Sequence, residues 1–322
     1  MIGRRALLAA PGLLAAPAFA QSWPTRPITL IVPFAAGGNV DTVARLTAAE
    51  LSKRLGQSVV VENAPGAGGT IGTERVARAA PDGQTLLVGV ESPFTISPHV
   101  TPGAVRYDAV RDFAPIGMIA SLPLTLVGRP DLPANDLAGV IALAKSRPEG
   151  LTFASSGTGT SLHLWGEIIA RRSGAKLEHV PYRIAAQIPT DLMASRLDLA
   201  VLTVTSTGPL LRDGRIKGFA ISSLEPAPGL PDLPPLARLP EFAGLEILAW
   251  QGLFAPARTD AAITRRVATE LDAMLADAEF RQRLANVGMT PWHKTPEELT
   301  ELVRSESARY AEVVRAGNIR AD

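Results

Sequence analysis

The order of strands and helices near the start of this sequence constrains its fold more than any other feature. Residues 28–32, 59–61 and 85–90 are short apolar, mostly β-branched runs that predict buried strands. Between them, residues 41–55 and 71–80 predict helices. A strand–helix–strand–helix–strand order predicts a parallel sheet covered by helices.

The same alternation returns later in the chain. Residues 113–128 form a long apolar stretch that is interrupted by Pro123. Further strands are expected at 151–154, 177–181, 197–203 and 216–222. Helices are expected at 137–145, 161–172 and 188–194. The sequence therefore predicts two α/β sheets of similar size.

The last third of the chain predicts a connection followed by two long helices. Residues 224–240 are rich in proline and lead to an extended apolar segment, 245–255. The first helix has an apolar face that runs from Ile263 to Ala278. The second begins with a capping box formed by Thr295 and Glu298, and its apolar face contains one acidic residue, Glu306.

The first twenty residues are typical of an export signal. Arg4 and Arg5 precede an apolar run, 6–18, that is too short to span a bilayer. Ala18-Phe19-Ala20 then provides a small-x-small cleavage site, so residues 1–20 are interpreted as a signal peptide cleaved after Ala20. This indicates a periplasmic protein. The paired arginines leave the general and the twin-arginine export routes open.

Composition and motifs exclude several classes of function. Lys and Arg together number 32 against 31 Asp and Glu, a balance that argues against a nucleic-acid partner. The chain has no cysteine, which excludes disulfides and thiolate metal sites. Walker, dinucleotide-binding and H-E-x-x-H patterns are absent. We expect no metal, no cofactor and a monomer.

Three glycine-rich loops lead directly into helices and could bind an anion. They are residues 35–39, 66–70 and 155–161. Backbone N–H groups and the positive end of a helix dipole make such loops ready anion sites. Two of them follow a strand directly, at the sheet edge where α/β proteins bind ligands. The alternative, that glycine only makes each turn tight, remains open.

Several side chains near these loops allow both a structural and a functional interpretation. Asp41 either caps its helix or faces the ligand, and the Tyr182 hydroxyl either reaches the cleft or packs. His163 either packs or hydrogen-bonds a neighbouring turn, or it rims the site and orients the loop before it. A hydrolase using Ser156 or Ser161 with His163 is an alternative, but no nucleophile elbow supports it.

Blocks of sequence throughout the chain resemble the Bug family, the solute-binding proteins of tripartite tricarboxylate transporters. These blocks are residues 23–28, 32–41, 61–69, 80–83, 112–116, 154–164, 179–182, 230–234 and 252–257. The resemblance implies an α/β fold of the type II periplasmic binding protein kind, with two lobes and parallel-type sheets joined by crossing segments. It places lobe 1 at 23–120 plus 225–322 and lobe 2 at 121–224.

The resemblance also implies a binding function rather than an enzyme. Family members hold small carboxylates, largely through backbone groups of the loops that correspond here to 34–39 and 155–161. The expected partners are membrane transporter subunits or, alternatively, a sensor kinase. The candidate ligand-binding residues are Phe34, Ala35, Ala36, Gly37, Gly38, Asn39, Asp41, Ser155, Ser156, Gly157, Thr158, Gly159, Thr160, Ser161, His163, Tyr182 and Thr203.

The sequence departs from the family pattern at three places. Ala35 and Ala36 replace two prolines, so the first loop is less stiff. Arg183 and Ile184 replace a Lys-Gly pair, and Leu202 and Thr203 stand where Asp and Asn are common. The lobe-2 side of the pocket is therefore expected to be less polar, which favours a ligand with more apolar surface than aspartate or citrate.

Overall fold

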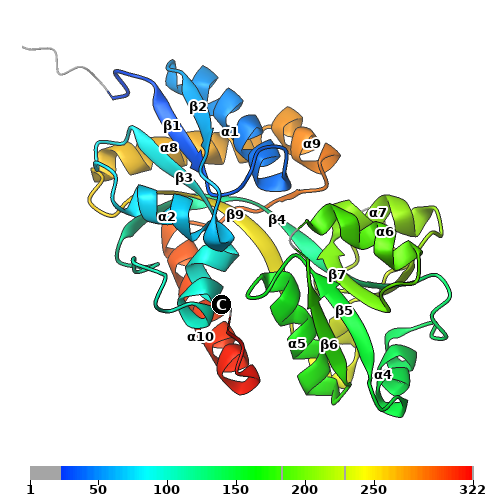
Figure 1. The fold of residues 1–322 in the computed structure, drawn as a ribbon. Coiled ribbons are helices and arrows are strands. Elements are labelled where there is room, and N and C mark those ends of the chain that lie inside the picture. The colour runs from blue at the N-terminus through cyan, green and yellow to red at the C-terminus, as the bar shows by residue number, and fades with distance from the viewer. Residues whose placement is uncertain (1–22, 183, 228–229, 321–322) are drawn as a thin grey trace, which may run out of the picture.

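The computed structural model describes residues 23–182, 184–227 and 230–320, which form two lobes joined by crossing strands (Figure 1). The expected signal peptide, with its cleavage site after Ala20, lies outside these residues, as does Arg183. Within the described ranges, no helix combines the length and the apolar character needed to cross a membrane.

The sheet of the first lobe has the strand order β2-β1-β3-β9-β4. Its parallel part consists of β1 (Ile28–Val32), β2 (Val59–Asn63) and β3 (Thr85–Val90), the three strands expected from the sequence. β9 (Leu248–Pro256) runs antiparallel to both β3 and β4 (Phe113–Gly128), and the short β10 (Thr290–Pro291) pairs with β4. The sheet is therefore mixed rather than wholly parallel.

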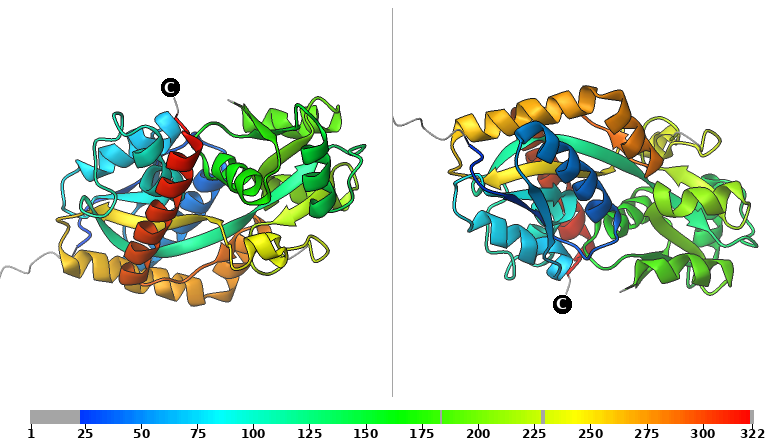
Figure 2. Two further views of the ribbon diagram at one scale, coloured as in Figure 1. Left: turned by 90° about the horizontal axis from the view of Figure 1, so that it is seen from below. Right: turned by 90° about the horizontal axis from the view of Figure 1, so that it is seen from above.

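Helices cover both faces of this sheet (Figure 2). On one face, α1 (Asn39–Leu55) and α8 (Ala261–Ala276) belong to the same apolar core as Leu30. On the other face, α2 (Thr70–Ala77) and α10 (Pro296–Gly317) pack with Ile31. Consecutive residues of β1 thus serve opposite faces, as the period of a strand requires. α10 begins with the capping box that the sequence predicted.

The second lobe repeats this plan. β7 (Leu199–Thr203), β5 (Leu151–Ser155) and β6 (Leu177–Pro181) form its parallel part. The second part of β4 pairs antiparallel with β7 and with β8 (Lys217–Ile221). Its helices are α4 (Leu137–Ser146), α5 (Ser161–Ser173), α6 (Ile188–Met193) and α7 (Val204–Arg212).

β4 is the strand that belongs to both sheets. Its residues 113–123 pair with β9 in the first lobe, and residues 124–128 pair with β7 and β8 in the second. Pro123, which interrupts the apolar stretch in the sequence, pairs with Leu248 at the start of β9. Proline has no N–H to donate, so it marks the point where β4 changes partners. β4 and β9 therefore connect the lobes.

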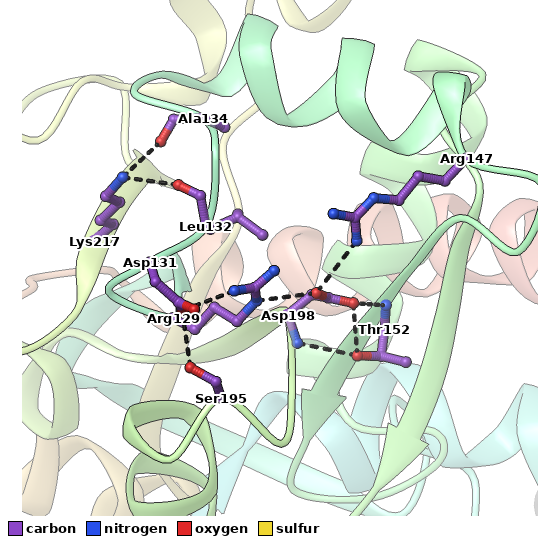
Figure 3. Close-up of polar contacts among 9 residues, drawn as sticks. All are labelled: Arg129, Asp131, Leu132, Ala134, Arg147, Thr152, Ser195, Asp198 and Lys217. Carbon is purple, nitrogen blue, oxygen red and sulfur yellow. Dashed lines mark hydrogen bonds and ion pairs between the residues drawn. The ribbon is translucent and has the colours of Figure 1, made fainter.

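A polar network ties together the end of the second lobe that lies away from β9 (Figure 3). The Asp198 carboxylate accepts hydrogen bonds from Arg129 Nε at 3.2 Å and from the Thr152 backbone N–H at 3.1 Å. Lys217 donates to two backbone carbonyls of the loop that follows β4. These bonds join the ends of four strands, which gives the cluster a structural role.

Three helical segments differ from what the sequence predicted. The sequence did not predict α7, which forms although Pro209 lies inside it. A single helix across 263–278 is wrong: α8 ends at Ala276, and Asp277 accepts from the Phe280 N–H to start α9 (Ala278–Asn286). After β3, residues Ser92–Ile96 form a π-helical turn that continues into the short helix α3 (Ser97–Val100).

Candidate functional site

A cavity of about 620 Å³ lies between the two lobes. Most of its walls follow the carboxyl ends of parallel strands, where α/β folds place their ligand sites. Residues after β1, β2, β3 and β5 contribute, in that order, Phe34; Ala67 and Gly68; Ser92 and Ser97; and Thr158, Gly159 and Thr160. Residues 100–104 and Arg320 complete the lining.

Hydrogen bonds centred on the Asp41 carboxylate hold the loop between β1 and α1. Asp41 Oδ2 accepts from the Gly37 N–H and from Arg45 Nε, both at 2.9 Å, and Oδ1 accepts from Asn63 Nδ2 at 3.0 Å. Asn63 Nδ2 also donates to the Phe34 carbonyl at 3.0 Å. The hydrogen bond from Arg45 is the largest influence that lowers the pKa of Asp41 to about 2, against the opposing effect of burial. Asp41 therefore stabilises the loop.

This network matches neither interpretation of Asp41, because the residue neither caps α1 nor faces the cavity. The residue is only 4% exposed and its oxygens are committed to the loop, so it does not line the cavity. Ala35, Ala36, Gly37 and Gly38 are exposed. Gly38 precedes α1 in an extended conformation, and no side chain caps this helix. The first N–H groups of α1, beginning at Asn39, have no partner within the helix and stay open to an anion.

The second-lobe loop is held by a stacked pair of histidines instead. The rings of His163 and His179 lie 3.8 Å apart between centroids and are tilted by 20°. His179 Nε2 is 2.7 Å from Ser155 Oγ, and His163 Nδ1 accepts from the Gly159 N–H at 3.1 Å. Burial, followed by the neighbouring His163, lowers the pKa of His179 to about 3. The low pKa keeps His179 uncharged, so a hydrogen bond and ring stacking hold this loop in place of an ion pair.

Helix α5, unlike α1, has a side-chain cap. Thr160 Oγ1 accepts from the His163 N–H at 3.2 Å and donates to the Gly157 carbonyl at 2.8 Å. His163 is buried, hydrogen-bonds the turn before its helix and orients that loop, but it does not line the cavity. The Gly159 N–H is occupied by His163, so this loop offers fewer open donors than the sequence predicted.

Ser161 bridges the lobes rather than facing the cavity. It is 2% exposed, and its hydroxyl donates to Oε1 of the buried Glu91 at 2.8 Å. Oε2 of Glu91 accepts from the Trp250 N–H at 3.2 Å, and Trp250 Nε1 donates to Glu306 at 2.8 Å. Burial raises the pKa of Glu91, and it raises the pKa of Glu306 to about 7. The acidic residue that stood out on the helix face thus belongs to a buried chain next to the crossing strands.

The other predicted site residues lie apart from the cavity lining. The Tyr182 hydroxyl donates to Asp191 Oδ2 at 2.7 Å, so it stabilises the position of α6, which contains Asp191. Thr203 Oγ1 lies 2.9 Å from Thr205 Oγ1, at the start of α7. Ser155 is fully buried beneath its loop, and Ser156 and Gly157 are half-buried within it. Of the predicted set, the structure brings Phe34, Thr158, Gly159 and Thr160 together around one cavity.

The candidate set lacked the residues that follow β2 and β3. Ala67 and Gly68 belong to a glycine-rich loop that the sequence flagged, and Ser92 and Ser97 follow the third parallel strand. The rule that parallel strands end at one edge could have found all four. Arg320 had no such signal, because it reaches the cavity from the end of α10. Among the residues described, no cluster of His, Asp or Glu could hold a metal ion.

Comparisons with known proteins cover nearly the whole chain. A family model described as tripartite tricarboxylate transporter family receptor matches residues 43–319. Protein BugT of Bordetella pertussis is 34% identical over 305 residues, which cover 94% of this chain and 92% of BugT.

Two solved structures share the arrangement of both lobes. R. palustris Rpa4515 with adipate has a TM-score of 0.82 at 32% identity, and the match covers 92% of this chain and 99% of that one. MatC (Rpa3494) from Rhodopseudomonas palustris with bound malate has a TM-score of 0.78 at 32% identity, covering 91% and 100%.

Proposed function

This chain belongs to the tripartite tricarboxylate transporter family of receptors, and we propose that it binds a small carboxylate in the cavity between its lobes. The resemblance to the Bug family and the two-lobed fold expected from it are both confirmed. The cavity is the observation that carries the proposal, because loops of both lobes form it. Closure of the lobes would surround a ligand there.

The lining suits a ligand with a polar end and an apolar body. Hydroxyls of Ser92, Ser97 and Thr158 can donate to a carboxylate, and the ring of Phe34 offers apolar surface. The open N–H groups at the start of α1 follow the loop that begins at Phe34, which is the residue of this loop that lines the cavity. Adipate and malate, the acids named with the two solved relatives, are both small dicarboxylates. We expect the ligand to be of this class.

The proposed role is binding without chemistry. Ser161 donates to Glu91 and His163 Nδ1 accepts from a backbone N–H, so these two residues do not form a nucleophile and base. Ser155 does pair with His179, but Ser155 is fully buried, so a substrate has no access to its hydroxyl. This arrangement supports a receptor that releases its ligand unchanged.

We propose slightly different limits for the lobes than those expected from the resemblance. The change of sheets by β4 after Pro123 supports a first crossing at 123/124 instead of 120/121. Leu230 and Leu233 pack with Ile221 of the second-lobe sheet, so the second crossing lies near Ile247 and not at 224/225. Lobe 1 then comprises residues 23–123 and 248–320.

The proposal extends to location and partners. Cleavage after Ala20 would release a periplasmic monomer that delivers its ligand to the membrane subunits of a tripartite transporter. The experiment that tests the binding role is calorimetry on the mature chain with diacids from malonate to suberate and with the matching monoacids. Mass spectrometry of ligand released from freshly purified protein identifies the natural acid. A mature chain that binds none of these acids and releases none would overturn the proposal.

A further inference from the structure

Helix α10 ends in a turn of defined geometry. Asn318 adopts a left-handed conformation with φ of 47°. Its N–H donates to the Arg315 carbonyl at 3.2 Å, and the Ile319 N–H donates to the Val314 carbonyl at 3.0 Å. These two bonds form a Schellman motif, which ends a helix and fixes the direction of the next residues. The residues after α10 therefore have a set path.

An apolar contact that involves both lobes anchors this turn. Ile319 is 7% exposed and belongs to one cluster with Val314, with Ile96 of the first lobe and with Leu164 of α5 in the second. Figure 2 shows the end of α10 next to α5. Because Ile319 is held there, the following residue, Arg320, lies at the boundary between the lobes and lines the cavity.

Arg320 is the single charged residue in the lining of this cavity, within the part of the chain that the structure describes. The other lining groups are hydroxyls, backbone and apolar surface, so they can hold one carboxylate by neutral donors. A guanidinium adds a fixed positive charge and a planar pair of donors that match a carboxylate. The cavity thus offers neutral donors and one cation, which are two different ways to bind an anionic group.

We propose that Arg320 binds a second carboxylate of the ligand and thereby makes the cavity select dicarboxylates over monocarboxylates of the same length. This inference rests on the proposed function, because it assumes that a carboxylate occupies the cavity. It goes beyond the proposed function because it assigns recognition of the second carboxylate to Arg320, which lies after the last helix and outside the glycine-rich loops.

The test compares two acids in three proteins. Adipate and hexanoate have the same number of carbons and differ in one carboxylate, so calorimetry with both isolates the second charge. Arg320→Gln should weaken adipate binding by about tenfold and change hexanoate binding by less than about twofold. Arg315→Gln is the matched control: Arg315 lies in the last turn of α10 and, like Arg320, lines a neighbouring cavity of about 450 Å³, but it does not line this one. It should leave the affinity for both acids unchanged.

Two further readouts separate the charge from a structural role. Arg320→Lys should restore part of the preference for adipate, because it keeps the charge but loses the planar fork. Raising the salt concentration should weaken adipate binding more steeply in the wild type than in Arg320→Gln, because salt screens an exposed cation. Circular dichroism checks that the variants keep their fold.

The outcomes are distinct for the inference and for the function it rests on. If Arg320→Gln weakens both acids equally, or neither, the inference is wrong while the receptor role stands. The inference is also overturned if Arg315→Gln weakens adipate binding as much as Arg320→Gln does, since long-range attraction by any nearby positive charge would then explain the preference. A wild type that binds monoacids but no diacid of the malonate-to-suberate series contradicts the inference alone. A wild type that binds no carboxylate removes both.

Discussion

The two glycine-rich loops that precede α1 and α5 are held in different ways. The loop before α1 is fixed by ionic bonds around Asp41, and its helix has no side-chain cap. The loop before α5 is fixed by neutral histidines, and Thr160 caps its helix. The first loop thus keeps its helix N–H groups open, whereas the second uses part of its donors internally. A shared glycine pattern therefore does not mean a shared role in binding.

The largest expected effect comes from removing the ionic support of the first loop. Asp41→Ala removes the buried carboxylate that accepts from the Gly37 N–H, from Arg45 and from the Asn63 amide. We expect a loss of about 2–4 kcal/mol in the free energy of unfolding. Urea denaturation measures it. Glu62→Ala is the matched control, because Glu62 also pairs with an arginine, Arg75, but both side chains are about half exposed. The control should cost less than about 1 kcal/mol.

The second loop should be the one that acid weakens first. The pKa of His179 is lowered to about 3, so below pH 6.5 the unfolded chain binds a proton that the folded loop excludes. The stability that His179 contributes is therefore complete above pH 6.5 and is lost progressively as the pH falls toward 3. Asp41, with a pKa of about 2, contributes above pH 3.8 and loses its effect only as the pH approaches 2. The two loops thus have separate acid windows.

The measurement is the difference in unfolding free energy between the wild type and His179→Gln from pH 7 to pH 4. The variant keeps a polar partner for Ser155 and should lack this part of the acid sensitivity. A difference is needed because the pKa of Glu306 is raised to about 7, so its contribution is present below pH 4.5 and is lost as pH rises through 7, the opposite trend. If wild type and variant show parallel pH curves, the neutral-histidine account of this loop is wrong.

The sequence predicted the strands and their order well, because apolar runs and glycine stops are local signals. It placed β1, β2 and β3 and the loops after β1 and β2. It could not show which backbone donors of the loops were free, because Asp41 and His163, which accept from them, are held by residues distant in sequence: Asn63 for the first loop and His179 for the second. The role of Arg320 depends on a turn after α10 and on packing across both lobes, neither of which leaves a local pattern.

A cap added to α1 would make the first loop resemble the second. Gly38 has φ of −78°, and a side chain there would meet nothing closer than the Ala35 carbonyl oxygen at 3.8 Å. Gly38→Asp should therefore cap the helix and stabilise it by about 1 kcal/mol. The added carboxylate should occupy the N–H groups that an anion needs, so carboxylate affinity should fall by about tenfold or more.

Calorimetry with adipate and a thermal unfolding scan measure both effects of this cap. Gly38→Ser serves as the control, because it caps the helix without a negative charge and should weaken binding less. If Gly38→Asp binds carboxylates as tightly as the wild type, the start of α1 is not part of the anion site. The two loops would then be equivalent in this respect.

The smallest expected effect concerns the bond that joins the second loop's helix to the first lobe. Ser161→Ala removes the hydroxyl that donates to Glu91 Oε1. While the lobes are together this oxygen is buried and would lack a donor, but water can reach it when they separate. The variant should therefore favour the separated arrangement by about 1 kcal/mol, with roughly a fivefold loss of ligand affinity.

Small-angle scattering tests this, because the radius of gyration of the unliganded variant should exceed that of the wild type, and adipate should reduce it in both. Ser173→Ala is the control: Ser173 lies on the same helix and is buried, but it donates to the Ile169 carbonyl within α5. It should change neither the radius nor the affinity. Equal behaviour of the two variants would show that the bond from Ser161 to Glu91 does not favour closure, and that the buried carboxylate obtains its second donor elsewhere.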